Sequence, residues 1–364
     1  MTIPTTDASV VVVGAGQAGL SVAFYLKRLG LEPGEDFVVL DRGPHTGGAW
    51  QHRWKALRLG NAHRVHDLPG MEEIGVSFES ADRMLPASEV VSDYYARYEE
   101  HFGLSVVRPV AVTDVENFGA DLRVHTTGGG GSHRITTDFV VNATGTWGSP
   151  FIPWYSGRDD FRGRQLHTAD YVSASEFRGQ RVVVVGGGTS AIGFLLELEK
   201  EAADLTWVSR RPVEFVDRDH LAVEAAAASV AMQDAAARAG QALPSIVSGT
   251  GIPRTRRLQA AINRGLLVSK PMFSAIEARG VRFPDGTFQK ADIILWATGF
   301  RPELRHLAPL GLREKAGGVS VALGVAEKDP RIFFAGYGPQ ASTSGANRSG
   351  RTIARQIVAG LRRR

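Results

Sequence analysis

Cysteine is absent from all 364 residues of this chain. Its absence excludes disulfide bonds, thiolate metal sites and a redox-active cysteine pair. Long apolar runs are missing too, since no segment approaches the roughly 18 residues needed to cross a bilayer. The first residues, Met1–Ser9, are polar and lack the apolar core of a signal peptide. We therefore expect a cytoplasmic protein with no membrane association.

An excess of one charge is missing as well. The net charge of +4 is modest and the basic residues are spread along the chain, so we expect no nucleic-acid partner. His63 and His66 are close in sequence, but no carboxylate motif accompanies them, and we expect no metal site. Hydrophobic residues make up 43% of the chain, which is ample for the cores of two domains.

Two glycine-rich turns are the most informative feature that the sequence does contain. The first is the G-x-G-x-x-G of Gly14–Gly19, which follows the valine run Val10–Val13. The second is the G-x-G-x-x-A of Gly186–Ala191, which follows Val182–Val185. A buried strand, such a turn and an apolar helix form a dinucleotide-binding unit. Two of them predict a chain that holds two dinucleotides.

The order of segments predicts how these units are connected. Each glycine turn is followed, much later in the chain, by an apolar strand that ends in Ala-Thr-Gly. Alternating strands and helices predict an α/β fold with two Rossmann-like domains, the second inserted in the first. We expect the first domain to comprise residues 1–155 and 301–364. A connector over 156–180 leads to the second domain, 181–300, which carries a helical insertion at about 215–265.

The first turn has the features of a complete ADP-ribose site. Gly14 permits the tight turn, Gly16 lets the backbone approach a pyrophosphate, and Gly19 lets the helix pack on the strand. The helix N-terminus then offers N–H groups to the phosphates. Asp41 ends the next strand, where a carboxylate accepts hydrogen bonds from a ribose and repels a 2′-phosphate. This pattern favours FAD or NAD over NADP, although a tight turn without a ligand remains an alternative.

The second turn differs in the charge that follows its next strand. Gly186, Gly188 and Ala191 take the same roles, but the following strand ends in Arg210 and Arg211. A guanidinium there can pair with a 2′-phosphate. The second nucleotide is therefore expected to be NADPH, with a solvated arginine pair as the alternative.

A third motif narrows the family. Phe161, Gly163, His167 and Tyr171 form F-x-G-x-x-x-H-x-x-x-Y just before the second turn. Together with the two turns, this resembles the fingerprint of class B flavoprotein monooxygenases, which comprise the flavin-containing and Baeyer–Villiger monooxygenases. The resemblance extends over the whole chain and is greatest to the short bacterial flavin-containing monooxygenases. The fingerprint ends in Tyr171-Val172, which is closer to the flavin-containing type than to the Baeyer–Villiger type.

Shorter segments strengthen this resemblance and supply further candidate site residues. Gly47–Trp50 resembles the GG-x-W segment that lies near the flavin in this family, and Asn61 falls where flavin-containing monooxygenases carry an active-site asparagine. We expect Asn61 and His167 to serve catalysis, His167 by coupling domain motion to NADP binding or by a structural role. Besides the residues already named, the expected cofactor contacts are Arg42, Gly48, Trp50, Ala143, Thr144, Gly145, Thr189, Ser190, Ala297, Thr298, Gly299, Gly336 and Tyr337. A final helix is expected to begin near Ser349–Arg351.

The resemblance implies a reaction as well as a fold. The expected enzyme contains FAD, uses NADPH, and forms a C4a-(hydro)peroxyflavin that oxygenates a thioether, an amine or, less readily, a ketone. Its partners are a small-molecule substrate and O₂, with a homodimer left open. Three other kinds of protein share parts of this pattern. A flavin disulfide reductase needs the cysteine pair that this chain lacks. A peroxide-releasing NADPH oxidase and a nucleotide-binding module without turnover share the same motifs.

Overall fold

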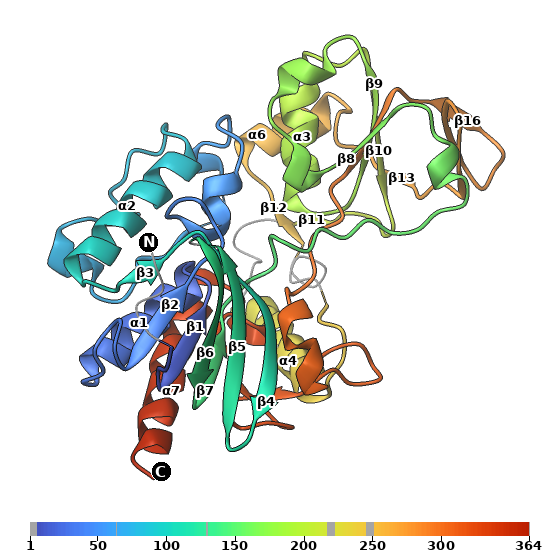
Figure 1. The fold of residues 1–364 in the computed structure, drawn as a ribbon. Helices are drawn as coiled ribbons and strands as arrows, with labels where there is room; N and C mark the ends of the chain where they lie inside the picture. The colour runs from blue at the N-terminus through green and yellow to red at the C-terminus, as the bar shows by residue number, and fades with distance from the viewer. Residues whose placement is uncertain (1–5, 63, 129, 217–222, 245–250, 364) are drawn as a thin grey trace. The chain divides into compact units, whose positions relative to one another are not determined.

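A computed structural model describes residues 6–62, 64–128, 130–216, 223–244 and 251–363 (Figure 1). Met1–Thr5 and His63 lie outside the described residues, so the expectations placed on them are not addressed by the structure. The chain divides into two compact units. The first comprises Met1–Gly145, Val230–Pro244 and Pro302–Arg364, and the second Thr146–Ser229 and Ser245–Arg301.

The first unit is built on a seven-stranded sheet with the order β18-β19-β20-β7-β1-β2-β3. Its central strand β1 (Val10–Val13) lies parallel to both β2 (Phe37–Leu40) and β7 (Phe139–Asn142). All three are fully buried and, apart from Asn142 at the end of β7, apolar, as expected of strands covered on both faces. The remaining strands are β3 (Val106–Val107), β18 (Val321–Ala322), β19 (Val325–Ala326) and β20 (Ile332–Phe334).

The alternation of side chains along β1 assigns the two faces of this sheet to two cores. Val10 and Val12 pack with residues of the helices α1 (Gln17–Arg28), α2 (Ala87–His101) and α7 (Thr343–Leu361). Val11 and Val13 belong to a second core with residues of a three-stranded antiparallel sheet. A strand that points successive side chains to opposite faces produces this division. The antiparallel strands are β4 (Val110–Phe118), β5 (Asp121–Gly128) and β6 (Gly131–Thr137).

The second unit is built on a five-stranded sheet with the order β13-β10-β9-β17-β8. Residues 164–167 of the expected connector form strand β8, which pairs in parallel with β17. The middle of the fingerprint, up to His167, is therefore part of this sheet. The strands are β8 (Arg164–His167), β9 (Arg181–Val185), β10 (Asp204–Ser209), β13 (Lys270–Pro271) and β17 (Ile293–Trp296).

The second unit also contains helices and short strands outside this sheet. Helix α3 (Thr189–Leu198) follows β9, and α6 (Arg256–Asn263) lies in the expected insertion. An antiparallel sheet contains β14 (Ala275–Glu277), β15 (Gly280–Arg282) and β16 (Phe288–Lys290), and a parallel pair contains β11 (Phe215–Val216) and β12 (Ile252–Pro253). No helix in the described part of the chain is long and apolar enough to span a membrane.

The alanine-rich helix of the insertion is α4 (Val223–Arg238), and the segment from Val230 to Pro244 belongs to the first unit. In that unit Ala237 is buried, and its side chain lies against Gly338. The hydroxyl of Ser320 donates a hydrogen bond of 2.6 Å to the carbonyl of Arg238. The sequence placed this whole segment in the second domain, because the chain order alone does not show which core accepts its apolar face.

Candidate cofactor and oxygenation site

The first glycine turn is closed by contacts that exclude side chains. Gly14 has φ +105°, and a Cβ there would lie 2.5 Å from the carbonyl oxygen of Ala143. A Cβ on Gly19 would lie 1.8 Å from the carbonyl oxygen of Gly14. The strand, the turn and the helix α1 can approach one another this closely only because both positions are glycine.

The middle glycine of this turn faces a segment from elsewhere in the first unit. A Cβ on Gly48, in the Gly47–Trp50 motif, would lie 2.7 Å from the Cα of Gly16. The turn containing Gly336 approaches α1 as well, with a distance of 3.1 Å from its potential Cβ to the Cβ of Ala18. The structure therefore brings three glycine-containing motifs, which are far apart in sequence, together at the start of one helix.

Electrostatics at the start of α1 suit an anion. Its first turn contains no acidic side chain, so its unpaired N–H groups and the positive end of its dipole are not neutralised locally. The buried carboxylate of Asp41 accepts a hydrogen bond of 2.7 Å from the amide of Ala15 and another of 2.7 Å from that of Gly43. An ionised carboxylate has about four lone-pair sites. Asp41 can therefore fix the turn and still accept a ribose hydroxyl.

The second turn repeats the backbone plan of the first. Gly186 has φ +144°, and its Cβ would lie 2.3 Å from the carbonyl oxygen of Ala297. The indole of Trp207 donates a hydrogen bond of 2.7 Å to the carbonyl of Gly186 and holds the turn in place. Around Gly188, in contrast, no atom of the described residues beyond its neighbours in the chain lies within 4 Å of the Cβ position. Packing does not require glycine there, whereas close approach of a phosphate group would.

The residues that flank the second turn are accessible. Arg210 and Arg211 are exposed, and neither forms an ion pair with the described residues. The hydroxyl of Ser209 donates to the carbonyl of Arg211 at 2.7 Å and so fixes the main chain that carries both arginines. Thr189 and Ser190 begin α3, whose first turn contains no acidic residue.

The two Ala-Thr-Gly segments have matching roles in the two units. Each ends in a glycine with positive φ, +62° at Gly145 and +79° at Gly299. The hydroxyl of Thr144 donates to the carbonyl of Glu303 at 2.8 Å, and that of Thr298 donates to the carbonyl of Phe151. Both threonine side chains therefore fix loops. Arg42, another expected cofactor contact, lies 3.7 Å from the carboxylate of Glu303.

His167 lies at the end of β8 and contacts one of these segments. Its side chain is 1% exposed, its Nδ1 accepts from the amide of Ala169 at 3.2 Å, and its Nε2 lies 2.9 Å from the carbonyl of Gly299. Because Nδ1 is an acceptor, Nε2 carries the proton and donates it to Gly299. Burial lowers the pKa of the imidazole. This geometry makes His167 a residue that positions the Ala-Thr-Gly turn.

Two expected cofactor contacts have their rings in the core. Trp50 is 7% exposed and packs with the helices of the first unit. Tyr337 is also 7% exposed, packs against Phe334, and accepts a hydrogen bond from the amide of Val319 at 3.2 Å. Little of either ring is available to a ligand, so their main chains are the groups that can face one. Asn61, in contrast, is exposed on the short 3₁₀ turn Leu59–Asn61.

Comparisons with known proteins agree with this architecture. Residues 11–235 match the family described as pyridine nucleotide-disulphide oxidoreductase. The flavin-containing monooxygenase from Stenotrophomonas maltophilia is 31% identical, with a TM-score of 0.80 over 98% of this chain and all of that one. A double mutant of a flavin monooxygenase from that organism gives 32% identity and a TM-score of 0.82 over the same shares of the two chains.

The chain belongs to the flavin monooxygenases. Two further relatives fit this assignment. The uncharacterized oxidoreductase CzcO of Bacillus velezensis is 26% identical over 89% of this chain and 90% of its own length. Senecionine N-oxygenase of Tyria jacobaeae is 25% identical over 80% of this chain and 58% of its own length. A flavin cofactor follows from the family.

A partly buried amide network of this flavin monooxygenase is not predicted by the sequence. Gln17, the first residue of α1, accepts a hydrogen bond from the hydroxyl of Tyr95. Its amide nitrogen lies 2.8 Å from Oδ1 of Asn347 and 3.1 Å from the carbonyl of His66. The ring of His66 in turn lies 2.7 Å from the hydroxyl of Thr343. The network ties α1, α2, α7 and the segment after Asn61 together.

The last helix begins earlier than the expected Ser349–Arg351, and residues of this network lie in its first turns. α7 begins at Thr343, with the Ser342 hydroxyl accepting from the amide of Gly345 at 3.0 Å. Ser349 and Gly350 are buried within the helix, and Gly350 packs on Ser21. Ser342 is a typical N-cap residue, and this signal would have located the helix start correctly.

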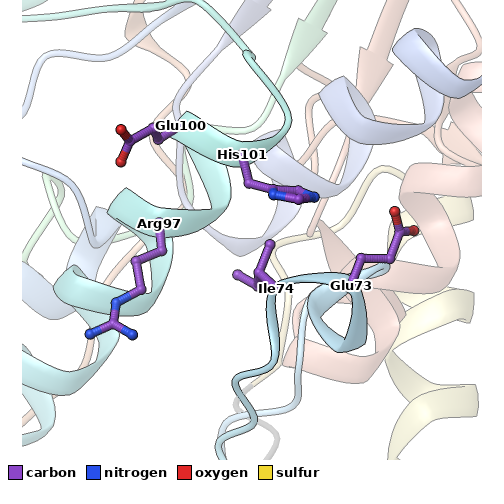
Figure 2. A pocket seen from close by; sticks show the side chains of 5 residues that line it. All are labelled: Glu73, Ile74, Arg97, Glu100 and His101. Carbon is purple, nitrogen blue, oxygen red and sulfur yellow. The ribbon is translucent and has the colours of Figure 1, made fainter.

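A surface pocket of the flavin monooxygenase is lined by residues other than the expected cofactor contacts. It has a volume of about 480 Å³ and is lined by Glu73, Ile74, Arg97, Glu100 and His101 (Figure 2). None of them was expected to bind a cofactor, and Figure 2 shows the Arg97 and Glu100 side chains directed away from His101 and Ile74. Among the described residues, no group of three or more histidines and acidic residues is placed to hold a metal ion.

Proposed function

We propose that the enzyme binds FAD at the first glycine turn and NADPH at the second, and oxygenates a small thioether or amine. Reduced flavin supplies the activation of O₂. The overall change would consume the substrate, O₂, NADPH and a proton, and yield the oxygenated substrate, NADP⁺ and water. The name of senecionine N-oxygenase supports a nitrogen nucleophile, and thioethers share the same soft character.

The main support for the proposal is a difference in charge. The two turns have matching backbones, but the strands that follow them end in side chains of opposite charge. Asp41 is a buried acid beside the first turn, and Arg210 and Arg211 are exposed cations beside the second. Two sites for the same nucleotide would not need opposite charges at equivalent positions. A carboxylate suits the free ribose of FAD, and a guanidinium suits the 2′-phosphate of NADPH.

The residues present fit a flavin dinucleotide at the first turn. The glycines at 14, 16, 19 and 48 allow close approach, the first turn of α1 is free of acidic groups, and Asp41 is held in place by two amides. Gly336 and the segment Ala143–Gly145 border the same helix start. Asn61 would offer a neutral hydrogen-bond donor to the oxygenation site.

A coupling measurement tests this function against its alternative, an NADPH oxidase that releases hydrogen peroxide. Purified protein should carry about one FAD per chain. With a thioether such as methyl phenyl sulfide, sulfoxide formed should account for most of the NADPH consumed. Asn61→Asp should keep the FAD and the NADPH consumption but divert oxygen to peroxide, because a carboxylate cannot donate the amide's hydrogen bond. Peroxide as the sole product of the wild type with both thioethers and amines would establish the oxidase alternative.

A further inference from the structure

The surface around Asn61 is basic and apolar at once. Two segments of the first unit run side by side here. The amide of Leu59 donates to the carbonyl of Leu85 at 3.0 Å, and the amide of Gly60 donates to the carbonyl of Arg83 at 2.9 Å. We call the resulting group of Arg58, Asn61, Arg83, Met84 and Leu85 the Asn61 lip. Its main-chain pairing fixes the lip beside Asn61.

One cation of the lip lies close to the main chain next to Asn61. Nη2 of Arg83 lies 3.4 Å from the carbonyl of Gly60, the residue before Asn61. Arg58 and Arg83 are both exposed, and neither forms an ion pair with the described residues. The neighbouring carboxylate of Asp82 accepts a hydrogen bond of 2.8 Å from the amide of Met84.

The other neighbouring charges leave the balance positive. Glu89 lies 3.7 Å from the ammonium of Lys55, so that pair is close to neutral as a whole. Arg64, three residues after Asn61 in the chain, is exposed and adds a further cation. The local field therefore attracts an anion, and at this degree of exposure it will be screened by salt.

Apolar side chains of the lip lie directly beside these cations. Met84 is 74% exposed and Leu85 is 47% exposed. These two neighbouring side chains offer an apolar surface that a ligand can cover. Methionine is also well suited to contact apolar bodies of varied shape.

We propose that the Asn61 lip recognises a carboxylate on the substrate, so that the preferred substrate is an anion in which the soft sulfur or nitrogen atom is borne by an apolar body. Met84 and Leu85 cover the apolar body, and the guanidinium groups of Arg58 and Arg83 bind the carboxylate. This substrate class rests on the proposed function, because it assumes that oxygen transfer takes place near Asn61.

The experiment compares two thioethers that differ by one carboxylate group on the ring, methyl phenyl sulfide and 4-(methylthio)benzoate. We expect the wild type to oxygenate the carboxylate with a higher kcat/KM, and this preference to fall as salt rises from about 50 mM to about 500 mM. Arg83→Gln and Arg58→Gln should each reduce kcat/KM for the carboxylate by about three- to tenfold. Each should therefore lower the ratio of kcat/KM for the carboxylate to kcat/KM for the neutral thioether, whereas the KM for NADPH should stay at the wild-type value.

Arg355→Gln is the matched control, since Arg355 is an exposed arginine on α7. It should retain the wild-type preference between the two thioethers. Equal kcat/KM for the two thioethers in the wild type would overturn the inference while leaving the oxygenation itself intact. A rise in the KM for NADPH, without a change in substrate preference, would assign the two arginines to the nucleotide and overturn it as well. If neither thioether is oxygenated but NADPH is consumed, the proposed function fails, and the inference fails with it.

Discussion

The two glycine turns share the same backbone conformation but differ in the residues that surround them. In both units the first glycine has positive φ and lies against the carbonyl oxygen of an alanine in an Ala-Thr-Gly segment, at 2.5 Å from the potential Cβ in one and 2.3 Å in the other. Around the second glycine the units differ. Gly16 faces the Gly48 segment, whereas Gly188 has open space. The shared part is what a strand–turn–helix junction requires, and the different part is where each unit can recognise its own ligand.

Substitution of the first glycine in each turn tests the shared part and should have the largest effect. Gly14→Ala and Gly186→Ala would each place a Cβ against main-chain oxygen and force alanine into a conformation disfavoured by about 1–3 kcal/mol. We expect loss of soluble protein or a large fall in melting temperature for both. If one variant melts like the wild type, the two junctions are not equivalent.

Substitution of the second glycine tests the difference. Gly16→Val should yield protein without FAD, because the side chain would occupy the space between the turn and Gly48. Gly188→Val should fold and keep its FAD, since no atom of the described residues beyond the local chain lies within 4 Å of that position. It should raise the KM for NADPH about tenfold or more by blocking the phosphates. Absorbance spectra and steady-state kinetics of the two variants measure these effects, and full flavin occupancy in Gly16→Val would refute the assignment of the first site.

The arginines at the end of the strand after the second turn test whether that unit selects NADPH. A charged hydrogen bond contributes about 1.5–3 kcal/mol, so Arg210→Gln or Arg211→Gln should raise the KM for NADPH roughly tenfold or more. The KM for NADH, which lacks the 2′-phosphate, should barely change. Kinetics with both nucleotides measure the ratio. Wild-type NADPH/NADH ratios in both variants would show that this strand end does not select the nucleotide.

Two buried histidines, one in each unit, predict a smaller difference in pH dependence. Both ring nitrogens of His167 are hydrogen-bonded, whereas Nε2 of His306, 4% exposed, has no partner among the described residues. Burial lowers the pKa of His306 to about 4, with Arg42 lowering it further and Glu303 and Asp114 opposing the shift. The unfolded chain, with a histidine pKa near 6.5, therefore binds more protons below that pH.

It follows that stability from His306 is present above pH 6.5 and is lost as the pH falls towards 4. The loss is about 1.4 kcal/mol for each pH unit. Melting temperatures of the wild type should fall between pH 6.5 and 5.5, and His306→Leu should reduce that fall. An unchanged slope in His306→Leu would show that His306 is not buried in its neutral form.

The sequence predicts those parts of the site that depend on residues close together in the chain. The valine runs, the glycine turns and Asp41 each specify a local conformation, and the strands over Val10–Val13 and Val182–Val185 form as expected. The polar network around Gln17 could not be predicted, because its members come from four separate segments. An amide at one position of a turn does not indicate which distant carbonyl it will meet.

The two-unit plan of this protein and the opposite charges beside its two turns follow from the sequence. Strand periodicity, glycine conformation and side-chain charge are all properties of short segments. Tertiary structure decided the rest. It placed residues 164–167 of the fingerprint in the second sheet as β8, turned His167 towards Gly299, and packed residues 230–244 on the first unit. Each of these depends on which apolar surfaces bury one another, and that choice is made by the complete set of competing surfaces in the folded chain.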